Sequence, residues 1–354
     1  MKKKALALVI ILSLFVLLLA RVDSAKSVSK TIVVPDDYLQ IQEAINAANE
    51  GDTILVKKGT YEEETLTINK TISLIGEGPS ITIVNLHPPW IFTGGFHLGG
   101  SGVEPDYGWD NAINIETNYA KVSGLTINSS EGGIRVSGVG NTLAGNNITT
   151  GLFLEGNSQN ITGNVVKGTI ICEDENHTIA DNNLVHLFVV ASGIMIRNNT
   201  ISGYNGGIQM GSYGNTIFNN TIVDCGGALF FWMGAADNLI YGNNFINSSV
   251  YQVKIQETSD PSMGKWDNGI FGNYWSDYLI RYPDASELGS SGIGNTAYVI
   301  DEYNKDNYPL MEPYGLSSIP TPKDELRPIV LASAILATVV LIGLGLLLYG
   351  IKRK

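Results

Sequence analysis

The chain has 354 residues, of which 16% are charged, 40 are glycine and 32 are asparagine. This composition excludes a helical bundle, a coiled coil and a disordered chain, and it favours short strands joined by tight turns. The formal net charge is −12, and 15 basic against 33 acidic residues remain when residues 1–25 and 352–354 are left out. Such a surface repels phosphate backbones, so no nucleic acid is expected as a partner.

Residues 1–25 have the pattern of an export signal. Three lysines precede a 16-residue apolar run from Ala5 to Ala20, and small residues follow at Ser24 and Ala25. This order is typical of a signal peptide, with cleavage expected after Ala25 or, alternatively, after Ala20. Retention of the segment as an uncleaved anchor is the other interpretation.

The stretch 34–52 has the pattern of an amphipathic helix. Its apolar residues share one helical face: Ile41, Ala44, Ile45 and Ala48. Asp37 with Gln40 resembles a capping box, and Gly51 is suited to end the helix. We expect residues 31–52 to form an N-terminal cap, followed by short strands at 53–56, 66–68, 71–76 and 81–84.

Residues 86–111 interrupt the strands with a long loop that is rich in glycine and aromatic residues. Aromatic rings can stack on sugar rings, and carboxylates can accept hydrogen bonds from sugar hydroxyl groups. The candidate carbohydrate-binding residues in this insertion are Trp90, Tyr107, Trp109 and Asp110. The alternative is a loop that folds back and covers apolar surface.

From residue 120 onward the sequence repeats one phrase. An asparagine and an aliphatic residue lead to a second, often doubled asparagine and then to a short apolar strand. The corresponding asparagines are Asn146, Asn164, Asn182, Asn198, Asn219, Asn243 and Asn273. A period near 20 residues is typical of a solenoid, in which stacked asparagines can hydrogen-bond from coil to coil. A leucine-rich repeat needs a consensus that is missing here, so we predict an all-β parallel β-helix of about ten coils.

Two features inside the repeats bear on chemistry. The acidic cluster Glu173, Asp174 and Glu175 follows a predicted strand and is a second candidate for sugar binding, with a solvated turn as the alternative. Cys172 and Cys225 lie about three coils apart in this register, roughly 14 Å at the usual strand spacing. A disulfide needs Cα atoms within about 7 Å, so two buried free thiols are expected.

Eight Asn-x-Ser/Thr sequons are candidate glycosylation sites in an exported chain. Some of them coincide with the predicted asparagine ladder, where the side chain would be buried. The eight asparagines are Asn69, Asn128, Asn147, Asn160, Asn176, Asn198, Asn219 and Asn247.

The C-terminal part of the sequence ends in a membrane-anchor pattern. Residues 266–314 are expected to cap the last coil, with the aromatic residues Tyr274, Trp275 and Tyr278. Residues 317–328 form a short proline-containing stalk, and the uncharged segment 329–349 would span about 31 Å as a helix. The basic tail 350–354 is expected to stay in the cytoplasm, which places the β-helix ectodomain, residues 26–316, outside.

Two regions carry a resemblance to a known family. Residues 41–78 resemble the start of pectin-lyase-like β-helices. The phrases GNYWSDY (272–278), GIGNTAYVID (292–301) and NKDNYPLMEP (304–313) resemble the ending of the periplasmic copper-binding (NosD-type) family, especially its archaeal surface members. The resemblance covers about residues 31–314 and implies a right-handed parallel β-helix. It does not imply one activity, because the superfamily contains enzymes, binding modules and proteins without known activity.

The function that these patterns favour is carbohydrate binding or a structural role at the cell surface, with envelope glycans as partners and no catalysis or cofactor assigned. A polysaccharide lyase or hydrolase is the first alternative and needs carboxylates from neighbouring coils. Arg135 and Arg197, the arginines of the repeats, have no evident acidic partner one coil away.

An accessory to copper-site assembly is the second alternative. The histidines and methionines are dispersed, so no metal site is expected. These residues are His87, His97, His177, His186, Met195, Met210 and Met233.

Overall fold

The computed structural model describes residues 28–89, 96–99, 102–105, 111–232, 235–256 and 264–315. Contacts divide the chain into Met1–Tyr314 and Gly315–Lys354, and nearly all described residues belong to the first unit. The predicted export signal, the predicted membrane helix at 329–349, the stalk and the basic tail lie outside the described residues. Within the described part, no helix has the length and apolar character needed to cross a membrane.

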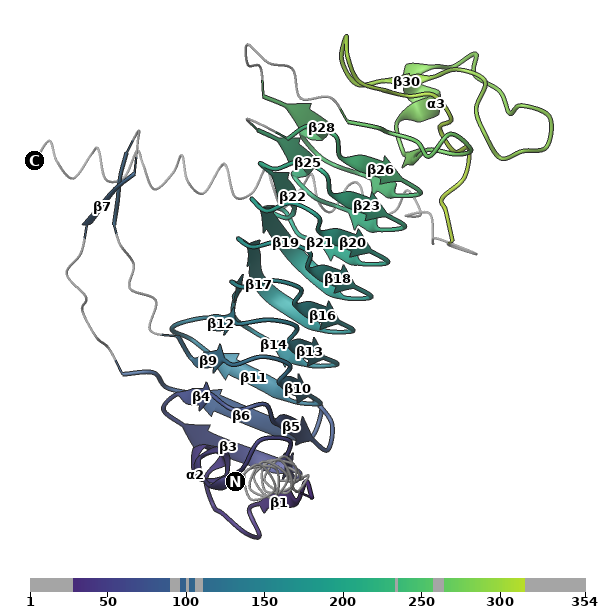
Figure 1. The fold of residues 1–354 in the computed structure, drawn as a ribbon. Helices are drawn as coiled ribbons and strands as arrows, with labels where there is room; N and C mark the ends of the chain where they lie inside the picture. The colour runs from purple at the N-terminus through teal and green to yellow at the C-terminus, as the bar shows by residue number, and fades with distance from the viewer. Residues whose placement is uncertain are drawn as a thin grey trace, which may run out of the picture. The chain divides into compact units, whose positions relative to one another are not determined.

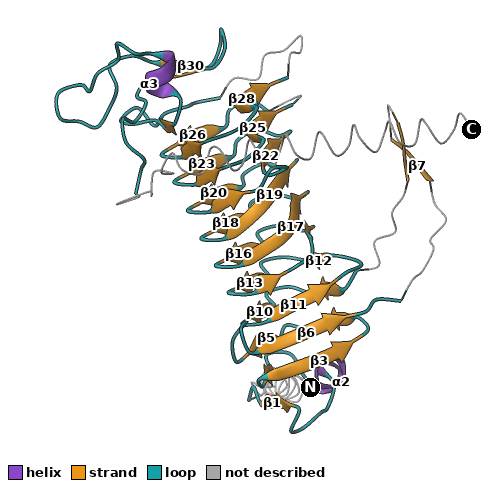
Figure 2. Ribbon diagram, turned by 180° about the vertical axis from the view of Figure 1, so that it is seen from behind, coloured by secondary structure: helices purple, strands orange, loops and turns teal. Residues whose placement is uncertain are grey.

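The described chain forms a right-handed parallel β-helix of about ten coils, as predicted. Figures 1 and 2 show the coils stacked from β1 to β28. Each complete coil passes through three parallel faces, which we call A, B and C in chain order. Faces B and C belong to one 17-stranded sheet, and face A is a separate 10-stranded sheet.

Face A contains β1 (Thr31–Val34), β2 (Thr53–Val56), β5 (Ser73–Gly76), β10 (Lys121–Ser123), β13 (Thr142–Ala144), β16 (Asn160–Thr162), β18 (Thr178–Ala180), β20 (Met195–Arg197), β23 (Thr216–Phe218) and β26 (Leu239–Tyr241). Face B contains β3 (Gly59–Glu63), β6 (Thr82–Leu86), β11 (Thr126–Ser129), β14 (Asn147–Ile148), β21 (Thr200–Ser202), β24 (Thr221–Val223), β27 (Asn244–Ile246) and β29 (Tyr274–Trp275). Face C contains β4 (Leu66–Ile68), β9 (Ile113–Glu116), β12 (Ile134–Ser137), β15 (Leu152–Leu154), β22 (Gly207–Met210), β25 (Gly227–Phe231) and β28 (Tyr251–Ile255).

Two longer strands run from face B into face C, namely β17 (Val165–Cys172) and β19 (Asn183–Val189). Outside the three faces lie the helices α2 (Ile41–Ala47) and α3 (Tyr278–Arg281), the antiparallel pair β7 (Phe96–Gly99) and β8 (Gly102–Pro105), and the antiparallel pair β30 (Tyr298–Val299) and β31 (Lys305–Asp306). The first of these pairs falls within the predicted insertion at 86–111.

The core consists of aliphatic columns that run along the stack. Alternate residues of each strand point inward, so equivalent positions of successive coils meet. On face A the central column is fully buried and contains Ile54, Leu74, Val122, Leu143, Ile161, Ile179, Ile196, Ile217 and Ile240. Burying one such side chain is worth about 1.5–3 kcal/mol, and no coil could bury its own column alone.

An asparagine ladder runs along the corner between faces A and B. Each main-chain N–H donates to the amide oxygen one coil further on, for example from Asn146 to Oδ1 of Asn164 at 2.9 Å and from Asn164 to Oδ1 of Asn182 at 2.8 Å. The members are Asn146, Asn164, Asn182, Asn199, Asn220, Asn243 and Asn273. A second ladder follows the corner between faces C and A and contains Asn141, Gln159, His177, Asn215 and Asn238.

The prediction was wrong by one residue in two coils, where Asn198 and Asn219 were assigned to the first ladder. These two residues have φ angles of 54° and 56°, in the left-handed region, and they form the corner itself. Glycine occupies the same corner position in other coils, for example Gly145 and Gly163. In the pairs 198–199 and 219–220 the second asparagine therefore points inward, because one further residue along the chain reverses the side-chain direction.

The N-terminal helix α2 packs against β1 to β4 and buries the predicted apolar face. The predicted capping box was wrong. The N-cap residue Gln40 makes no capping bond, and Asp37 instead accepts a hydrogen bond from the N–H of Val33. The N–H of Ile41, which has no partner within the helix, donates to the buried carboxylate of Glu63 at 2.6 Å. A side chain 22 residues away in the sequence thus caps the helix in place of a neighbouring residue.

The helix also ends earlier than predicted. It stops at Ala47, before Gly51. The ammonium group of Lys70 donates to the main-chain oxygens of Asn46 and Ala48, at 2.7 and 2.8 Å. A cation thus satisfies carbonyl groups at the negative end of the helix dipole.

The C-terminal segment closes the last coil with aromatic rings. Trp275 is buried and stacks between Phe245 and Tyr298, with centroid distances of 4.5 and 4.1 Å. Asp306 ends the first ladder: its carboxylate accepts hydrogen bonds from the N–H of Asn273 at 2.7 Å and from Nε1 of Trp275 at 2.9 Å. The aromatic residues of this segment thus cover the open end of the solenoid.

Both cysteines are free and buried, as predicted. Burial raises the pKa of Cys172 to about 12 and the pKa of Cys225 to about 11, so both thiols stay protonated. We expect neither thiol to react with Ellman's reagent in the native protein and both to react after denaturation. A thiol count of zero in the denatured, unreduced protein would contradict this assignment.

Candidate functional site

The outward side chains of face C form a row across consecutive coils. Parallel strands in register place equivalent positions about 4.8 Å apart, so these side chains stack over one another. The row is largely apolar and aromatic, with a charged residue at each end: Arg135, Phe153, Ile171, Phe188, Gln209, Phe230 and Lys254. Face C therefore carries a strip of half-buried aromatic residues.

Glycines beside this strip let further rings lie flat on the sheet. A Cβ atom at Gly227 would lie 2.1 Å from the ring of Tyr251, and one at Gly211 would lie 2.5 Å from the ring of Trp232. Trp232 in turn stacks on Phe188, with a centroid distance of 5.6 Å and an interplanar angle of 25°. A larger residue at either glycine would push the ring off the sheet, so the glycines preserve the flat surface.

Beside the last part of the strip, long corner loops and the strands of face C together form a hollow. Residues 203–206, 224–226 and 247–250 connect faces B and C there, whereas β17 and β19 pass from B to C without a loop. The hollow has a volume of about 340 Å³. Its lining consists of Tyr204, Asn205, Gly206, Ile208, Gln209, Gly226, Gly227, Phe230, Val250 and Tyr251.

The chemistry of the hollow is that of stacking and neutral hydrogen bonding. Burial raises the pKa of Tyr251, so its hydroxyl group stays protonated and can donate. The ammonium group of Lys254 lies 5.8 Å from the ring centroid of Phe230, at the rim of the strip. None of the described lining residues is acidic, basic or histidine. The arrangement suits an uncharged, hydroxyl-rich ligand with an apolar face.

A family comparison covers this part of the solenoid. Residues 187–279 match the family described as periplasmic copper-binding protein (NosD). Residues 187–279 thus form a NosD-type part of the β-helix. All residues that line the hollow fall within the matched segment.

Solved structures are similar to the chain at low sequence identity. The A-module of mannuronan C-5 epimerase AlgE4 from Azotobacter vinelandii has a TM-score of 0.44 and 15% identity, covering 66% of this chain and 82% of that one. Pectin methylesterase PemA from Erwinia chrysanthemi has a TM-score of 0.36 and 12% identity, with coverages of 67% and 92%. Similarity at this level carries no statement about activity or substrate. No curated protein matches the chain.

The residues predicted to bind sugar do not coincide with the hollow. Trp90, Tyr107, Trp109 and Asp110 lie outside the described residues. The acidic cluster 173–175 is exposed at the end of β17, and none of its members lines the hollow. The carboxylate of Asp174 accepts a hydrogen bond from the N–H of Gly156.

Both repeat arginines have acidic partners one coil away, contrary to expectation. Arg135 pairs with Glu155 of the next coil at 2.7 Å, and Arg197 pairs with Asp181 of the preceding coil at 3.4 Å. The prediction failed because Glu155 is not the register partner of Arg135. The register partner is Phe153, and Glu155 lies two residues after it in the same coil. These pairs are partly exposed ion pairs, a kind that contributes little to stability.

The described histidines do not fit a copper site. His87 pairs with Glu62 at 2.8 Å, and the side chain of His97 lies outside the described residues. His177 is a buried member of the second ladder, and burial lowers its pKa to about 4, whereas His186 stands on face C. Within the described chain, no three His, Cys, Asp or Glu side chains come together as a metal site would require.

The sequon asparagines lie at corners and strand ends and not in the ladders. Asn176, Asn198, Asn219 and Asn247 have left-handed φ angles between 52° and 64°. Four of the eight are exposed, namely Asn69, Asn176, Asn198 and Asn247, and the others are half-buried. The expectation that some sequons are buried in the ladder was therefore wrong. Asn198 and Asn219 each lie one residue before the asparagine that belongs to the ladder.

The hollow itself was missed at the level of sequence, although a signal was present. Several face C strands carry a bulky or polar residue between two inward aliphatic residues, as in GLFL (151–154), GIQM (207–210) and ALFF (228–231). Alignment of these middle residues would have brought Phe153, Gln209 and Phe230 into one row. The contribution of the corner loops required the three-dimensional arrangement.

Proposed function

We propose that this chain is a membrane-anchored surface protein that binds carbohydrate through the hollow in face C. The observation that carries the proposal is the combination of flat rings and neutral amides around one hollow. The Tyr251 and Phe230 rings offer apolar faces, and the side chains of Asn205 and Gln209 offer donors and acceptors. A pyranose ring presents the same two features, an apolar face and a rim of hydroxyl groups.

The proposed location rests on the two ends of the sequence and on the family description. Residues 1–25 have the pattern of an export signal, and residues 329–349 have that of a membrane helix. The family is described as periplasmic, which supports export of the β-helix. Envelope glycans are the carbohydrate that a protein anchored in this way would meet first.

The two alternative functions find less support in the described residues. A lyase or hydrolase needs carboxylates at the bound sugar, and the lining of the hollow contains none. An accessory to copper-site assembly needs converging soft ligands, and the described histidines are on separate faces. A purely structural role shares the fold and differs from the proposal in predicting no glycan retention.

Replacing Tyr204 with alanine should weaken retention on a bound polysaccharide by about threefold to tenfold. The ring of Tyr204 is 76% exposed and lines the hollow, so its removal deletes a stacking surface and leaves the core intact. An aromatic stacking contact is worth about 0.5–1.5 kcal/mol. The full-length protein in detergent would be applied to a panel of neutral and acidic polysaccharides, with retention and release of new chain ends recorded together.

The matched control is Tyr213→Ala, which removes another exposed tyrosine (62%) that does not line the hollow. Retention that falls in Tyr204→Ala and not in Tyr213→Ala supports the proposal. Equal retention by both variants would move the binding site elsewhere. Release of new chain ends would show an enzyme and overturn the assignment of binding without catalysis.

A further inference from the structure

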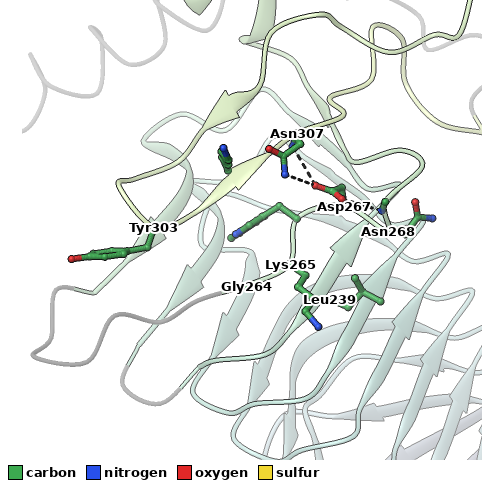
Figure 3. Close-up of a pocket in the computed structure, with 10 residues that line it drawn as sticks. Leu239, Gly264, Lys265, Asp267, Asn268, Tyr303 and Asn307 are labelled. Carbon is green, nitrogen blue, oxygen red and sulfur yellow. Dashed lines mark hydrogen bonds between the residues drawn. The ribbon is translucent and has the colours of Figure 1, made fainter.

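A second cavity lies at the C-terminal end of the solenoid, separate from the hollow in face C (Figure 3). Its volume is about 520 Å³. Leu239, the first residue of β26, contributes one wall from face A, and Tyr303 and Asn307 contribute another from the segment around β31. The two cavities share no residue, and the second one does not depend on the proposed function.

Two lysines line this cavity, and both are held by well-defined backbone. Lys265 extends face A by one rung: its N–H donates to the carbonyl of Asn238 at 2.8 Å, and its carbonyl accepts from the N–H of Ile240 at 2.7 Å. Lys305 belongs to β31, directly before the buried Asp306. Because side chains alternate along a strand, the inward position of Asp306 places Lys305 on the outer side.

Neither lysine has an ion-pair partner among the described residues. The cavity also contains the carboxylate of Asp267, so two ammonium groups and one carboxylate give the lining a formal charge of +1. Asp267 accepts hydrogen bonds from Nδ2 of Asn307 at 3.0 Å and from the N–H of Gly269 at 3.0 Å. Two ammonium groups thus line one cavity of a chain whose net charge is −12.

The remaining wall is aromatic. Tyr303 lines the cavity with half of its surface exposed. Its ring is therefore available for contact with a ligand. The cavity lining therefore combines two lysines without ion-pair partners among the described residues, one aspartate, one exposed ring and several amides.

We propose that this cavity is a second sugar site, and that it binds the carboxylate group of an acidic sugar such as a uronic acid. The ammonium groups of Lys265 and Lys305 would pair with the carboxylate, and the ring of Tyr303 would contact the apolar face of the sugar. The cavity differs in this respect from the hollow in face C, whose lining is uncharged. A chain with both sites holds an acidic polysaccharide at two points.

The test is a titration of the full-length protein in detergent with sodium glucuronate and, separately, with glucose, followed by calorimetry. Glucuronate should bind more tightly than glucose, and raising the NaCl concentration from 50 to 500 mM should weaken its binding. In the double variant Lys265→Gln/Lys305→Gln, the Kd for glucuronate should rise about tenfold. Both lysines are exposed, so the thermal unfolding midpoint should not change.

Two control variants separate this site from general charge effects and from face C. Lys121→Gln removes an exposed lysine of face A that is seven rungs away, and it should leave glucuronate binding unchanged. Tyr204→Ala weakens sugar binding at the hollow in face C, so the glucose and glucuronate titrations are repeated in this variant, where their difference reports on the second cavity. Equal affinity for glucose and glucuronate, or full glucuronate binding by the double variant, would overturn the proposal.

Inorganic phosphate is tested as a further ligand, because it carries negative charge without a sugar ring. Weak competition by phosphate is expected, since it can pair with the same ammonium groups. Phosphate that binds more tightly than glucuronate would show a general anion site and overturn the assignment to an acidic sugar.

Discussion

Asn220→Ala is expected to lower the free energy of unfolding by about 3–5 kcal/mol, one of the two largest effects that we predict. The side chain is fully buried in the first ladder. Its Oδ1 accepts from the N–H and Nδ2 of Asn199, both at 2.9 Å, and its Nδ2 donates to Oδ1 of Asn243 at 2.9 Å. Alanine would leave these buried groups unpaired on both neighbouring coils, and each such group costs about 1–3 kcal/mol.

The control for this prediction is the residue immediately before it. Asn219 stands at the left-handed corner, where Gly145, Gly163 and Gly242 stand in other coils. Asn219→Gly also deletes an amide, yet it should change the unfolding free energy by only about 0.5 kcal/mol. Urea unfolding of both variants gives the comparison, and similar losses in the two would contradict the ladder assignment.

Asp306 is expected to make the protein less stable as the pH rises from about 4 to about 6. Burial raises the pKa of this carboxyl group to about 6 from an ordinary value of 3.8, despite the hydrogen bonds that favour its charged form. In this window the folded state binds the proton that the unfolded state has released, so the free energy of unfolding falls with rising pH. The full loss is about 3 kcal/mol at 1.36 kcal/mol per pKa unit.

Unfolding measured at several pH values, with Asp306→Asn as the variant, isolates this contribution. Asparagine keeps one acceptor for Asn273 and Trp275 and loses the bond from the N–H of Tyr308, so the variant starts lower at pH 4. Its stability should then vary less with pH than that of the unchanged protein. Asp224→Asn alters an exposed corner residue and should keep the original slope. Parallel pH profiles for all three proteins would rule out this role for Asp306.

The architecture could be predicted from the sequence because its determinants are local and repeated. The strands at 53–56 and 66–68 have the expected bounds, since alternating aliphatic residues between turn residues specify them directly. The apolar face of α2 follows from helical spacing in the same way. The ladder was predicted in kind, but an Asn-Asn pair leaves two possible registers, and only the φ angles of Asn198 and Asn219 distinguish them.

The remaining differences come from contacts between residues that are distant in the sequence. Glu63 reaches the N-terminus of α2 across 22 residues, and Arg135 meets Glu155 across 20. The hollow in face C combines residues from three coils, none of which carries a motif. The aromatic residues of the insertion at 86–111 led to the prediction of a binding loop there. The aromatic surface that the structure describes is instead formed by one outward residue from each of several successive face C strands.

The position of the long corner loops has a consequence for how such a protein changes over evolutionary time. Spacing along the first ladder grows from 18 to 30 residues, while the strands of face A keep their register. The added residues between β21 and β22, and between β27 and β28, enter where faces B and C meet. These same loops supply Tyr204, Asn205 and Val250 to the hollow. Mutation can therefore reshape ligand preference in these loops with little effect on the stacked core, so that selectivity and foldability vary as separate traits.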